Sequence, residues 1–469
     1  MSSLWILLEM YQVMNDAPIY HVILEVCLVM LVLWLLVRKS YNPLDAQELT
    51  EAEKEEIISE WIPEPLVESI PETHRVLNPR LINGKVGKYV VIDDHKCLNM
   101  ASHNFLGLVE NKEMEETAIK CLEKYGVGSC GPRGFYGTVD VHLELEEKIA
   151  KFVNMEEAVV YSYGFSTIAS AIPAYAKRAD LIFVDECVNF AIQKGLDASR
   201  STIRFYKHNS MEDLERLLEE QVKQDVLKPK KAKATRRFLV VEGIYMNTGS
   251  IAPLPKLIEL RKKYKLRIFI DESLSFGTLG STGRGITEYF NIPVEEVDLL
   301  SSSLEWSVAS IGGFCAGTSF IVEHQRLSGL GYCFSASLPP LLASAAIKAL
   351  DIMQENPSMF AELKQNCHLV QESLESINGL TLSGHEDSPV KHLYLSVPCE
   401  TREEEEGKLL AIVDYCLTHG IALTVPSYLE DKEVNLPRPS LRIAVNILLT
   451  KEEISKVKNV LSKACEDML

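Results

Sequence analysis

The sequence of 469 residues lacks the marks of several protein classes. Its eleven cysteines form no CxxC pair, which argues against a zinc module and against a disulfide framework. Basic residues number 48 against 66 acidic ones, so the net charge is −18 and a nucleic-acid binder is not favoured. Hydrophobic residues make up 46% of the chain, which excludes a disordered or collagen-like protein. These absences leave a folded chain that faces a reducing compartment.

No lysine or arginine occurs before Arg38, and this stretch contains one long apolar run. Residues 19–37 are close to the roughly 20 that a helix needs to cross a bilayer, and Glu25 is the one acidic residue among them. Arg38 and Lys39 follow directly, so the positive-inside rule places the body in the cytosol and the N-terminus in the lumen. A signal peptide is disfavoured, because the start has neither a basic region nor a small-residue cleavage site. We therefore predict a lumenal stub and a single transmembrane helix within residues 1–44, with the helix over about 18–37.

Residues 45–85 are acidic and contain several prolines, unlike the apolar run before them. Residues 45–62 are typical of an amphipathic acidic helix whose apolar side chains face a membrane or a partner. Three prolines then interrupt regular structure and indicate an arm. The apolar residues are Ile57, Ile58, Trp61 and Ile62, and the prolines are Pro63, Pro65 and Pro71.

From about residue 86 onward, short apolar runs alternate with helical stretches. Runs rich in Val, Ile and Phe without polar alternation suit strands buried on both faces, and their alternation with helices indicates a parallel sheet. We predict an α/β fold with a large domain at 86–340 and a smaller α+β domain at 341–469. The expected strands of the large domain are 156–162, 180–185, 202–207, 237–243, 266–272 and 297–303, after a hairpin at 88–100; those of the small domain are 392–397, 421–425 and 441–446.

The segment 228–237, KPKKAKATRR, holds six basic residues in ten. We interpret it as a solvated loop, with a role at a membrane surface or in nuclear import as an alternative.

Asp271 ends a predicted strand, where a carboxylate can pair with the protonated ring nitrogen of a pyridinium cofactor or simply cap a helix. Its continuation, DESLSFGTLGSTGRG at 271–285, resembles a signature of the α-oxoamine synthases. These are fold-type I pyridoxal-phosphate transferases that condense an amino acid with an acyl-CoA. Further matches follow in the family's order, which makes the set more specific than any one motif. They are ASHNFLGL (101–108), GPRGFYGTVDVHLELE (131–146), YSYGFSTIAS (161–170), VVEGIYMNTGSIAPL (240–254) and CFSASLPP (333–340).

The departures from this family pattern concern the chemistry. The family's Schiff-base lysine lies six residues before a Gly-Gly pair, and Trp306 stands there in this chain. No lysine occurs between Lys265 and Lys348, so a shift of register does not supply the amine. Asn189 replaces the imidazole that stacks on the cofactor ring, and Leu274 replaces a histidine three residues after the ring-nitrogen aspartate. The resemblance thus implies a degenerate cofactor cup without catalytic residues or a metal, in which Asp271 and Ser303 are relics.

The combination of one membrane segment and a missing lysine is similar to eukaryotic serine palmitoyltransferases, whose heterodimers pair a lysine-bearing chain with one that lacks it. This resemblance implies a location in the endoplasmic reticulum membrane and a partner, long-chain base subunit 2 or 3, that binds pyridoxal 5′-phosphate. It also implies a small activating subunit and ORM-type regulators as partners. Active sites of this fold lie between subunits, so the resemblance implies contributions to the partner's site from Cys130, Arg133, Tyr136 and Ser335.

Arg442 matches the position at which the family holds the substrate carboxylate. For a chain without the Schiff-base amine we prefer a structural salt bridge at this position.

Two other functions are weighed against this interpretation. The first is an active α-oxoamine synthase with its lysine elsewhere, and the lysine-free span counts against it. The second is a membrane-anchored scaffold or regulator that contributes nothing to an active site.

Overall fold

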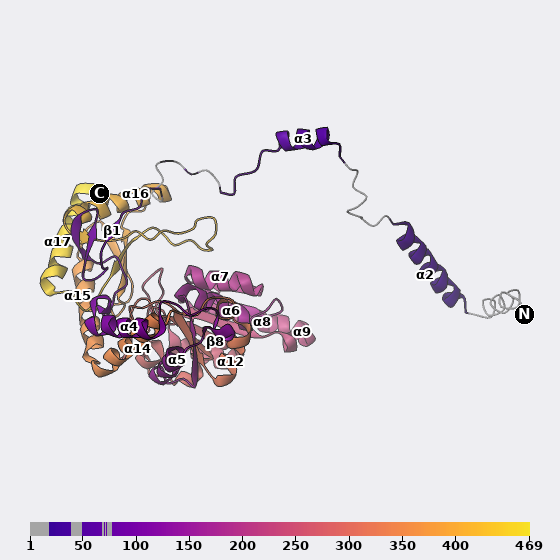
Figure 1. The fold of residues 1–469 in the computed structure, drawn as a ribbon, viewed down its shortest axis with the longest axis horizontal. Helices are drawn as coiled ribbons and strands as arrows, with labels where there is room; N and C mark the ends of the chain where they lie inside the picture. Colours follow the sequence, from indigo (N-terminus) through magenta and orange to yellow (C-terminus); the bar gives the residue numbers. More distant parts are fainter. Residues whose placement is uncertain (1–17, 39–48, 68–69, 71, 73–76) are drawn as a thin grey trace, which may run out of the picture. The chain divides into compact units, whose positions relative to one another are not determined.

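The computed structural model describes residues 18–38, 49–67, 70, 72 and 77–469, and the chain divides into two compact units, 1–79 and 80–469 (Figure 1). In the first unit, helix α2 spans Ile19–Val37 and is long and apolar enough to cross a membrane. Its apolar side chains are exposed and not packed into a protein core, as a lipid-facing helix requires. The stub predicted before α2 lies outside the described residues, apart from Pro18.

The predicted acidic helix is shorter than expected. Helix α3 covers Glu51–Glu60 and begins with a capping box, in which Glu53 accepts a hydrogen bond from the Thr50 backbone N–H at 2.8 Å. Trp61 and Ile62 lie beyond its end, because Pro63 disfavours helical geometry in the residue before it. Residues 45–48 of the prediction fall outside the described part of the chain.

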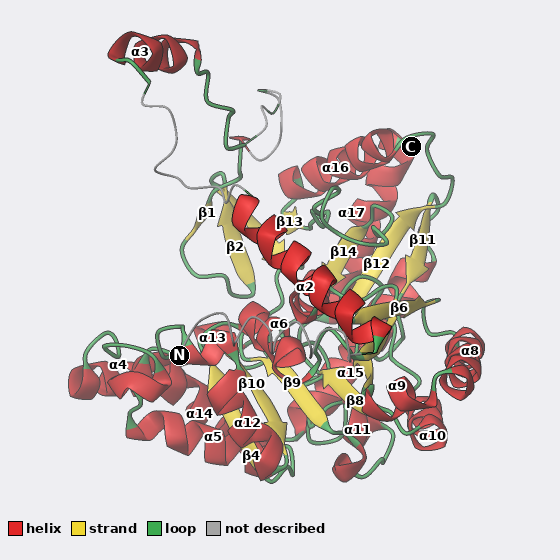
Figure 2. Ribbon diagram, turned by 90° about the vertical axis from the view of Figure 1, so that its right-hand side faces the viewer, coloured by secondary structure: helices red, strands yellow, loops and turns green. Residues whose placement is uncertain are grey.

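A seven-stranded mixed sheet forms the centre of the second unit (Figure 2). Strands β5 to β9 pair in parallel, as predicted, and β10 runs antiparallel to both β4 and β9. The sequence analysis missed β10, because Gly-Phe-Cys-Ala-Gly offers no run of β-branched residues. In sheet order the strands are β4 (Glu157–Tyr161), β10 (Gly313–Gly317), β9 (Leu299–Ser303), β8 (Arg267–Asp271), β7 (Arg237–Glu242), β5 (Leu181–Asp185) and β6 (Thr202–Tyr206).

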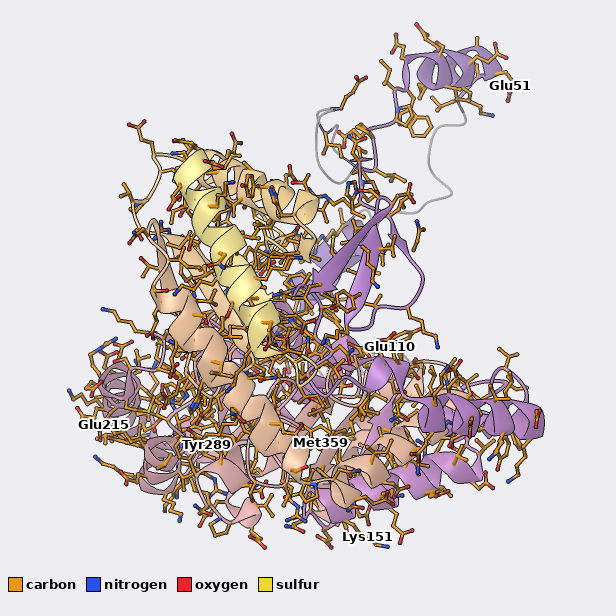
Figure 3. All side chains as sticks on the ribbon, turned by 90° about the vertical axis from the view of Figure 1, so that its left-hand side faces the viewer. Glu51, Glu110, Lys151, Glu215, Tyr289 and Met359 are labelled. Atoms are coloured by element: carbon orange, nitrogen blue, oxygen red, sulfur yellow. The ribbon has the colours of Figure 1, made fainter. Side chains whose placement is uncertain are left out.

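Helices cover this sheet and bury its apolar side chains in one continuous core. Helix α6 packs against β9 and β10, α5 packs against β4, and α14 packs against both α4 and α5. In Figure 3, Lys151 of α5 and Glu215 of α8 lie at the outside of the body. The helices of this region are α4 (Lys112–Tyr125), α5 (Asp140–Phe152), α6 (Gly164–Tyr175), α7 (Phe190–Ser199), α8 (Met211–Leu227), α9 (Pro229–Ala234), α10 (Leu254–Tyr264), α11 (Ile286–Tyr289), α12 (Ser319–Ser328), α13 (Leu330–Cys333) and α14 (Pro340–Glu355).

The C-terminal part builds a small antiparallel sheet, β11 (Leu380–Ser383), β12 (Val390–Leu395) and β14 (Leu441–Ala444), beside α15 (Ser358–Glu375), α16 (Arg402–Thr418) and α17 (Lys451–Met468). The run 421–425, expected as a strand of this sheet, forms only the short β13 (Ile421–Ala422). It pairs in parallel with β3 (His95–Asn99), which continues a sheet of β1 (Ile82–Asn83) and β2 (Tyr89–Ile92). The predicted hairpin at 88–100 is confirmed, with Asp93 and Asp94 at positive φ in its turn.

The basic segment 228–237 is not the loop we expected. Residues Pro229–Ala234 form α9, because Pro229 lies at the first helical position and alanines and lysines favour a helix. Arg237 already begins β7.

Candidate functional site

A cavity of about 560 Å³ lies where β8 and β9 end and where α6 and α7 begin. This is the edge at which α/β sheets gather their ligands. We call it the cup and define it by six of its lining residues: Gly164, Asn189, Asp271, Ser303, Trp306 and Arg442. The structure thus brings together the positions that the sequence analysis assigned to a degenerate cofactor site. Leu274 is the exception, because it is buried in the core and does not line the cavity.

The carboxylate of Asp271 is occupied by its own chain. The Asn189 side-chain amide donates to it at 3.0 Å, and the Ser273 hydroxyl and backbone N–H donate at 2.5 and 3.0 Å. Burial raises the pKa of Asp271 above its usual range. The nearby Glu242 is also buried, and burial together with the charge of Asp271 raises its pKa to about 8. Asp271 thus already accepts three hydrogen bonds from its own chain.

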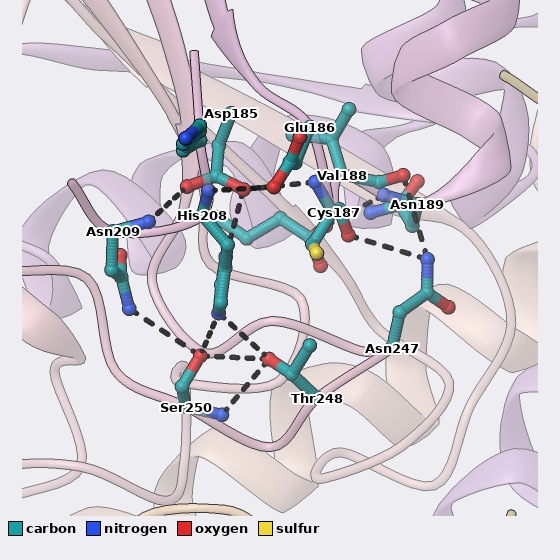
Figure 4. A network of polar contacts seen from close by, with 12 residues as sticks. Asp185, Glu186, Cys187, Val188, Asn189, His208, Asn209, Asn247, Thr248 and Ser250 are labelled. Carbon is teal, nitrogen blue, oxygen red and sulfur yellow. Dashed lines mark hydrogen bonds and ion pairs between the residues drawn. The ribbon is translucent and has the colours of Figure 1, made fainter. Parts of the chain in front are cut away.

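A polar network behind the cup holds Asn189 in place (Figure 4). Asp185 accepts hydrogen bonds from the backbone N–H groups of Cys187 and Asn209 at 2.9 and 2.8 Å. His208 lies 2.8 Å from Asp185 through Nδ1 and 2.6 Å from the Ser250 hydroxyl through Nε2. Asp185, Cys187 and His208 are close enough to share a metal ion, but both ring nitrogens of His208 already have protein partners. We therefore assign this network to positioning the turn that carries Asn189.

A carboxylate of the same chain also occupies the amino end of α6. The Gly164 backbone N–H donates to the Glu305 carboxylate at 3.2 Å. The Glu305 backbone N–H in turn donates to the Ser303 hydroxyl at 3.0 Å. Free N–H groups at a helix start attract anions, and here a carboxylate of the same chain takes that position. Sequence reasoning missed Glu305, although its place directly before Trp306 was a signal.

Trp306 fills part of the cup and meets His103, another residue that sequence reasoning missed. The two rings pack edge to face with centroids 5.1 Å apart. The His103 Nε2 atom is buried without a hydrogen-bond partner. Burial, with smaller contributions from Arg442 and His392, lowers the pKa of His103 well below its usual range, so the ring stays neutral.

Arg442 does not form the salt bridge that we expected. Within the described residues no carboxylate lies in ion-pair range of its guanidinium, and its buried Nε has no hydrogen-bond partner. Its Nη1 donates to the Met246 sulfur at 3.8 Å. Burial lowers the pKa of Arg442.

Pyridoxal phosphate does not fit the groups that this cup presents. None of the described residues that line the cavity is a lysine, so the cup offers no amine. Asp271 is bound by Asn189 and Ser273, and the Glu305 carboxylate stands where a phosphate would need the Gly164 N–H. A phosphate placed there would meet a like charge at contact distance.

The segments 129–138 and 334–338, which carry the residues expected at the partner's site, lie side by side, although about 200 residues separate them. The Ser337 backbone N–H and hydroxyl both donate to the Gly131 carbonyl, at 3.0 and 2.9 Å. His142 Nε2 lies 2.6 Å from the Leu338 carbonyl oxygen. Tyr136 sits at φ 68° with its ring fully exposed, and Cys130 is also exposed. Ser335 is half-buried, and its hydroxyl donates to the Ala336 carbonyl at 3.1 Å.

Arg133, expected to contribute to the partner's site, points into its own chain. It is buried and forms a two-pronged ion pair with Glu146 at 2.8 and 3.0 Å, and its Nε donates to the Thr138 hydroxyl at 2.9 Å. The guanidinium also lies over the ring of Tyr332. The N–H groups of the Arg133 guanidinium therefore hold the loop 129–138, because all three of its nitrogens donate hydrogen bonds within this chain.

Exposed apolar side chains surround this pair of segments. Each of them lies within one of the two segments or a few residues from it in the chain, and exposed apolar patches mark protein interfaces. These side chains are Val127, Phe135, Tyr136, Leu143, Leu330 and Phe334.

The sequence model of the aminotransferase class I and II family matches residues 95–460. Long chain base biosynthesis protein 1b of Oryza sativa is 42% identical over 452 residues, covering 96% of this chain and 92% of its own. Serine palmitoyltransferase 1 of Dictyostelium discoideum is 42% identical over 449 residues, covering 93% and 92%. Serine palmitoyltransferase 1 of Saccharomyces cerevisiae is 32% identical over 509 residues, covering 97% and 90%.

Solved structures confirm the fold. A serine palmitoyltransferase from S. paucimobilis superposes with a TM-score of 0.75 at 22% identity, covering 89% of this chain and 96% of its own. The enzyme from Sphingomonas wittichii gives a TM-score of 0.74 at 22% identity, covering 91% and 99%.

Proposed function

Because this chain belongs to the aminotransferase class I and II family, and within it to the relatives named serine palmitoyltransferase 1 and long chain base biosynthesis protein 1, we propose that it is the non-catalytic subunit of a serine palmitoyltransferase. That enzyme condenses L-serine with palmitoyl-CoA to 3-oxosphinganine, CoA and CO₂. The lysine and the pyridoxal phosphate belong to the partner, long-chain base subunit 2 or 3. When bound, the cofactor supplies the electron sink for the condensation.

One observation carries the proposal: side chains of this chain occupy the groups around the cup that would hold a cofactor, while the frame around the cup is intact. The Asn189 amide donates a hydrogen bond to Asp271, and Glu305 accepts one from the Gly164 N–H. Trp306 lines the cup at the position where the family has its lysine. An active α-oxoamine synthase would need a lysine in this cavity. The arrangement therefore supports a structural subunit over an active enzyme.

The paired segments 129–138 and 334–338 support a part in the partner's site. Their apolar residues are exposed and their backbone is fixed by hydrogen bonds, which suits an interface formed without much rearrangement. In our proposal Ser335, Tyr136 and Cys130 face the partner's cofactor pocket, and Arg133 holds the loop that presents them. In our proposal this chain supplies no catalytic residue.

The apolar helix α2 supports a membrane anchor. We propose a single-pass protein of the endoplasmic reticulum membrane with a lumenal N-terminus and a cytosolic body, since the first basic residues follow α2 directly. Long acyl chains partition into membranes, so an anchor brings the enzyme to palmitoyl-CoA. A small activating subunit and ORM-type regulators are further proposed partners, with residues 1–71 as their contact region.

The alternative function is a membrane scaffold without a role in catalysis, and co-expression with the lysine-bearing subunit separates the two. Ser335→Ala and Tyr136→Ala should leave the yield of the complex unchanged. They should raise the cofactor concentration needed for half-maximal activity, because groups at the partner's cofactor pocket are lost.

Ser376→Ala is the matched control, because Ser376 is an exposed serine after α15, in the C-terminal part of the chain. It should change neither the yield nor the cofactor requirement. If Ser335→Ala and Tyr136→Ala behave like this control, the chain does not complete the partner's site and the scaffold is the better description.

A further inference from the structure

Helix α9 packs beside α8 at one edge of the body (Figure 1). A group of basic side chains lies on and beside these two helices. We call it the basic patch and define it as Arg204, Lys228, Lys230, Lys231 and Lys233. All five residues are exposed. None of them forms an ion pair within the described part of the chain, in a protein whose net charge is −18.

The acidic residues next to the basic patch are already neutralised. Asp180 pairs with Arg236 at 2.7 Å, and Asp225 pairs with Arg237 at 2.5 Å. Other lysines of this body, such as Lys456 and Lys458 of α17, also lack an ion pair among the described residues, but the patch gathers four lysines within the six residues 228–233. The positive charge of the patch is therefore left for a ligand outside the described chain.

Part of the basic patch surrounds a hollow. Arg204, Lys228 and Lys231 line a cavity of about 220 Å³ between β6, α8 and α9. The same cavity exposes neutral hydrogen-bonding side chains, namely Thr202, Gln221, Gln224 and Thr235. Two carboxylates, Asp180 and Asp225, also line this hollow, and each is paired with an arginine, so three cations and several neutral side chains remain for a phosphate group.

The local fold does not by itself explain this charge. Lys228 follows the carboxyl end of α8, where a cation favours the helix dipole. Lys230 and Lys233, however, are like charges three residues apart on the short α9, and such pairs destabilise a helix. A counter-anion would remove that repulsion.

Apolar side chains stand beside the basic patch on the last turns of α8. Val226 and Leu227 are 75% and 79% exposed, and Val222 lies one turn earlier on the face of Val226. Lysines next to exposed aliphatic groups fit the surface of an anionic bilayer, which offers phosphates and an apolar layer beneath them. A nucleic acid would favour aromatic side chains for stacking, and the patch has none.

We propose that the basic patch with Val226 and Leu227 is a second membrane contact that docks the body on anionic lipid headgroups. The chain itself supplies the reason for a bilayer as the occupant, because α2 tethers the body to a membrane through the 42 residues 38–79. Each lysine near an anionic surface contributes about fivefold to binding. The proposal goes beyond the proposed function and needs no partner subunit.

Hydrogen exchange on the full-length chain reconstituted in lipid nanodiscs tests the proposal. Peptides that cover residues 221–237 are compared in discs of phosphatidylcholine alone and in discs with about 30% phosphatidylserine. We expect exchange at least about fivefold slower in the anionic discs, and loss of this difference as salt shortens the range of the attraction. The salt titration uses the unaltered chain, so it does not depend on a variant that folds.

The variant K228Q/K230Q/K231Q/K233Q should lose the difference between the two discs, and V226S/L227S should reduce it. The control K451Q/K456Q/K458Q/K463Q removes equal charge from α17 and should retain it. Equal exchange in both discs, or protection that survives in the patch variant, would overturn the proposal. Protection by soluble glycerophosphoserine at matched concentration, or by a short RNA but not by anionic discs, would assign the patch to a free phosphate or to a nucleic acid instead.

Discussion

Glu305 and Trp306 are neighbours in the chain but alter the cup in different ways. Trp306 removes the amine and fills space, whereas Glu305 sets a negative charge at the start of α6. A lysine at position 306 would therefore restore the amine but would leave the Glu305 carboxylate at the start of α6. The like charge still opposes the cofactor's phosphate.

We expect Trp306→Lys to bind pyridoxal phosphate weakly, and E305S/W306K to bind it at least about tenfold more tightly, because a like charge at contact distance is removed. Visible absorbance during a cofactor titration measures this difference. The control E433S/W306K removes another carboxylate that lines the cup but accepts a hydrogen bond from the Leu429 N–H at 2.8 Å and not from α6. Equal affinity of E305S/W306K and the control for pyridoxal phosphate would show that the Glu305 carboxylate does not oppose binding of the cofactor.

The buried pair of Arg133 and Glu146 gives a prediction about stability. Glu146→Gln leaves the Arg133 guanidinium buried without its counter-charge, so we expect a loss of about 3–5 kcal/mol in the free energy of unfolding. Denaturant unfolding of the chain measures this loss. Glu147→Gln is the control on the same helix, because its ion pair with Lys151 is exposed and should change stability by less than about 0.5 kcal/mol. A small loss for Glu146→Gln would show that the pair does not hold the loop.

Among single residues, the sequence predicted Asn189, Asp271 and Trp306 at one site because each occupies a position in a known motif. It did not predict that Asn189 bonds to Asp271, since the two lie 82 residues apart and their contact depends on the fold. For the same reason the sequence did not predict that the Arg133 side chain points into its own chain. Its partner Glu146 belongs to another element, and the motif alone does not say which way the guanidinium points.

At the scale of elements, the loop 129–138 and the segment 334–338 act as one unit. Gly137 allows their close approach, because a Cβ at this position would collide with the Gly131 carbonyl and the Ser337 hydroxyl. Gly134 lies on the same loop, and a Cβ there would meet open space.

Gly137→Ala should therefore separate the two segments and reduce the yield of complex with the lysine-bearing subunit severalfold, while Gly134→Ala should leave it unchanged. Co-purification of the two subunits measures the yield, and circular dichroism of each variant reports whether the chain is folded. A folded Gly137→Ala chain that assembles normally would contradict the assignment of these segments to the interface.

The strands of the central sheet were predicted well because buried parallel strands are continuous apolar runs. β10 was missed for want of such a run, and β13 was assigned to the wrong sheet. The pairing of β13 with β3 joins residues more than 300 positions apart, and no local pattern specifies such a pairing. The short α9 was read as a loop because its lysines outweighed its helix-favouring residues.

At the scale of the whole molecule, the chain combines an apolar helix with a body that has the frame of a transferase and a cup without a lysine. Length and hydropathy sufficed to predict the helix, and ordered motifs sufficed to predict the fold. The division into a large and a small domain at residue 340 stays a prediction.

The central claim is that this chain holds no lysine-bound cofactor and that its partner does. The most direct test is to incubate the purified chain, alone and in complex with the lysine-bearing subunit, with pyridoxal phosphate. Visible absorbance, borohydride reduction and peptide mass mapping then locate any bound cofactor. We expect no absorbance band and no reduced adduct for the chain alone, and an adduct confined to the partner's lysine in the complex. A reduced adduct on any lysine of this chain, accompanied by the absorbance band, would contradict the account and identify the chain as an enzyme in its own right.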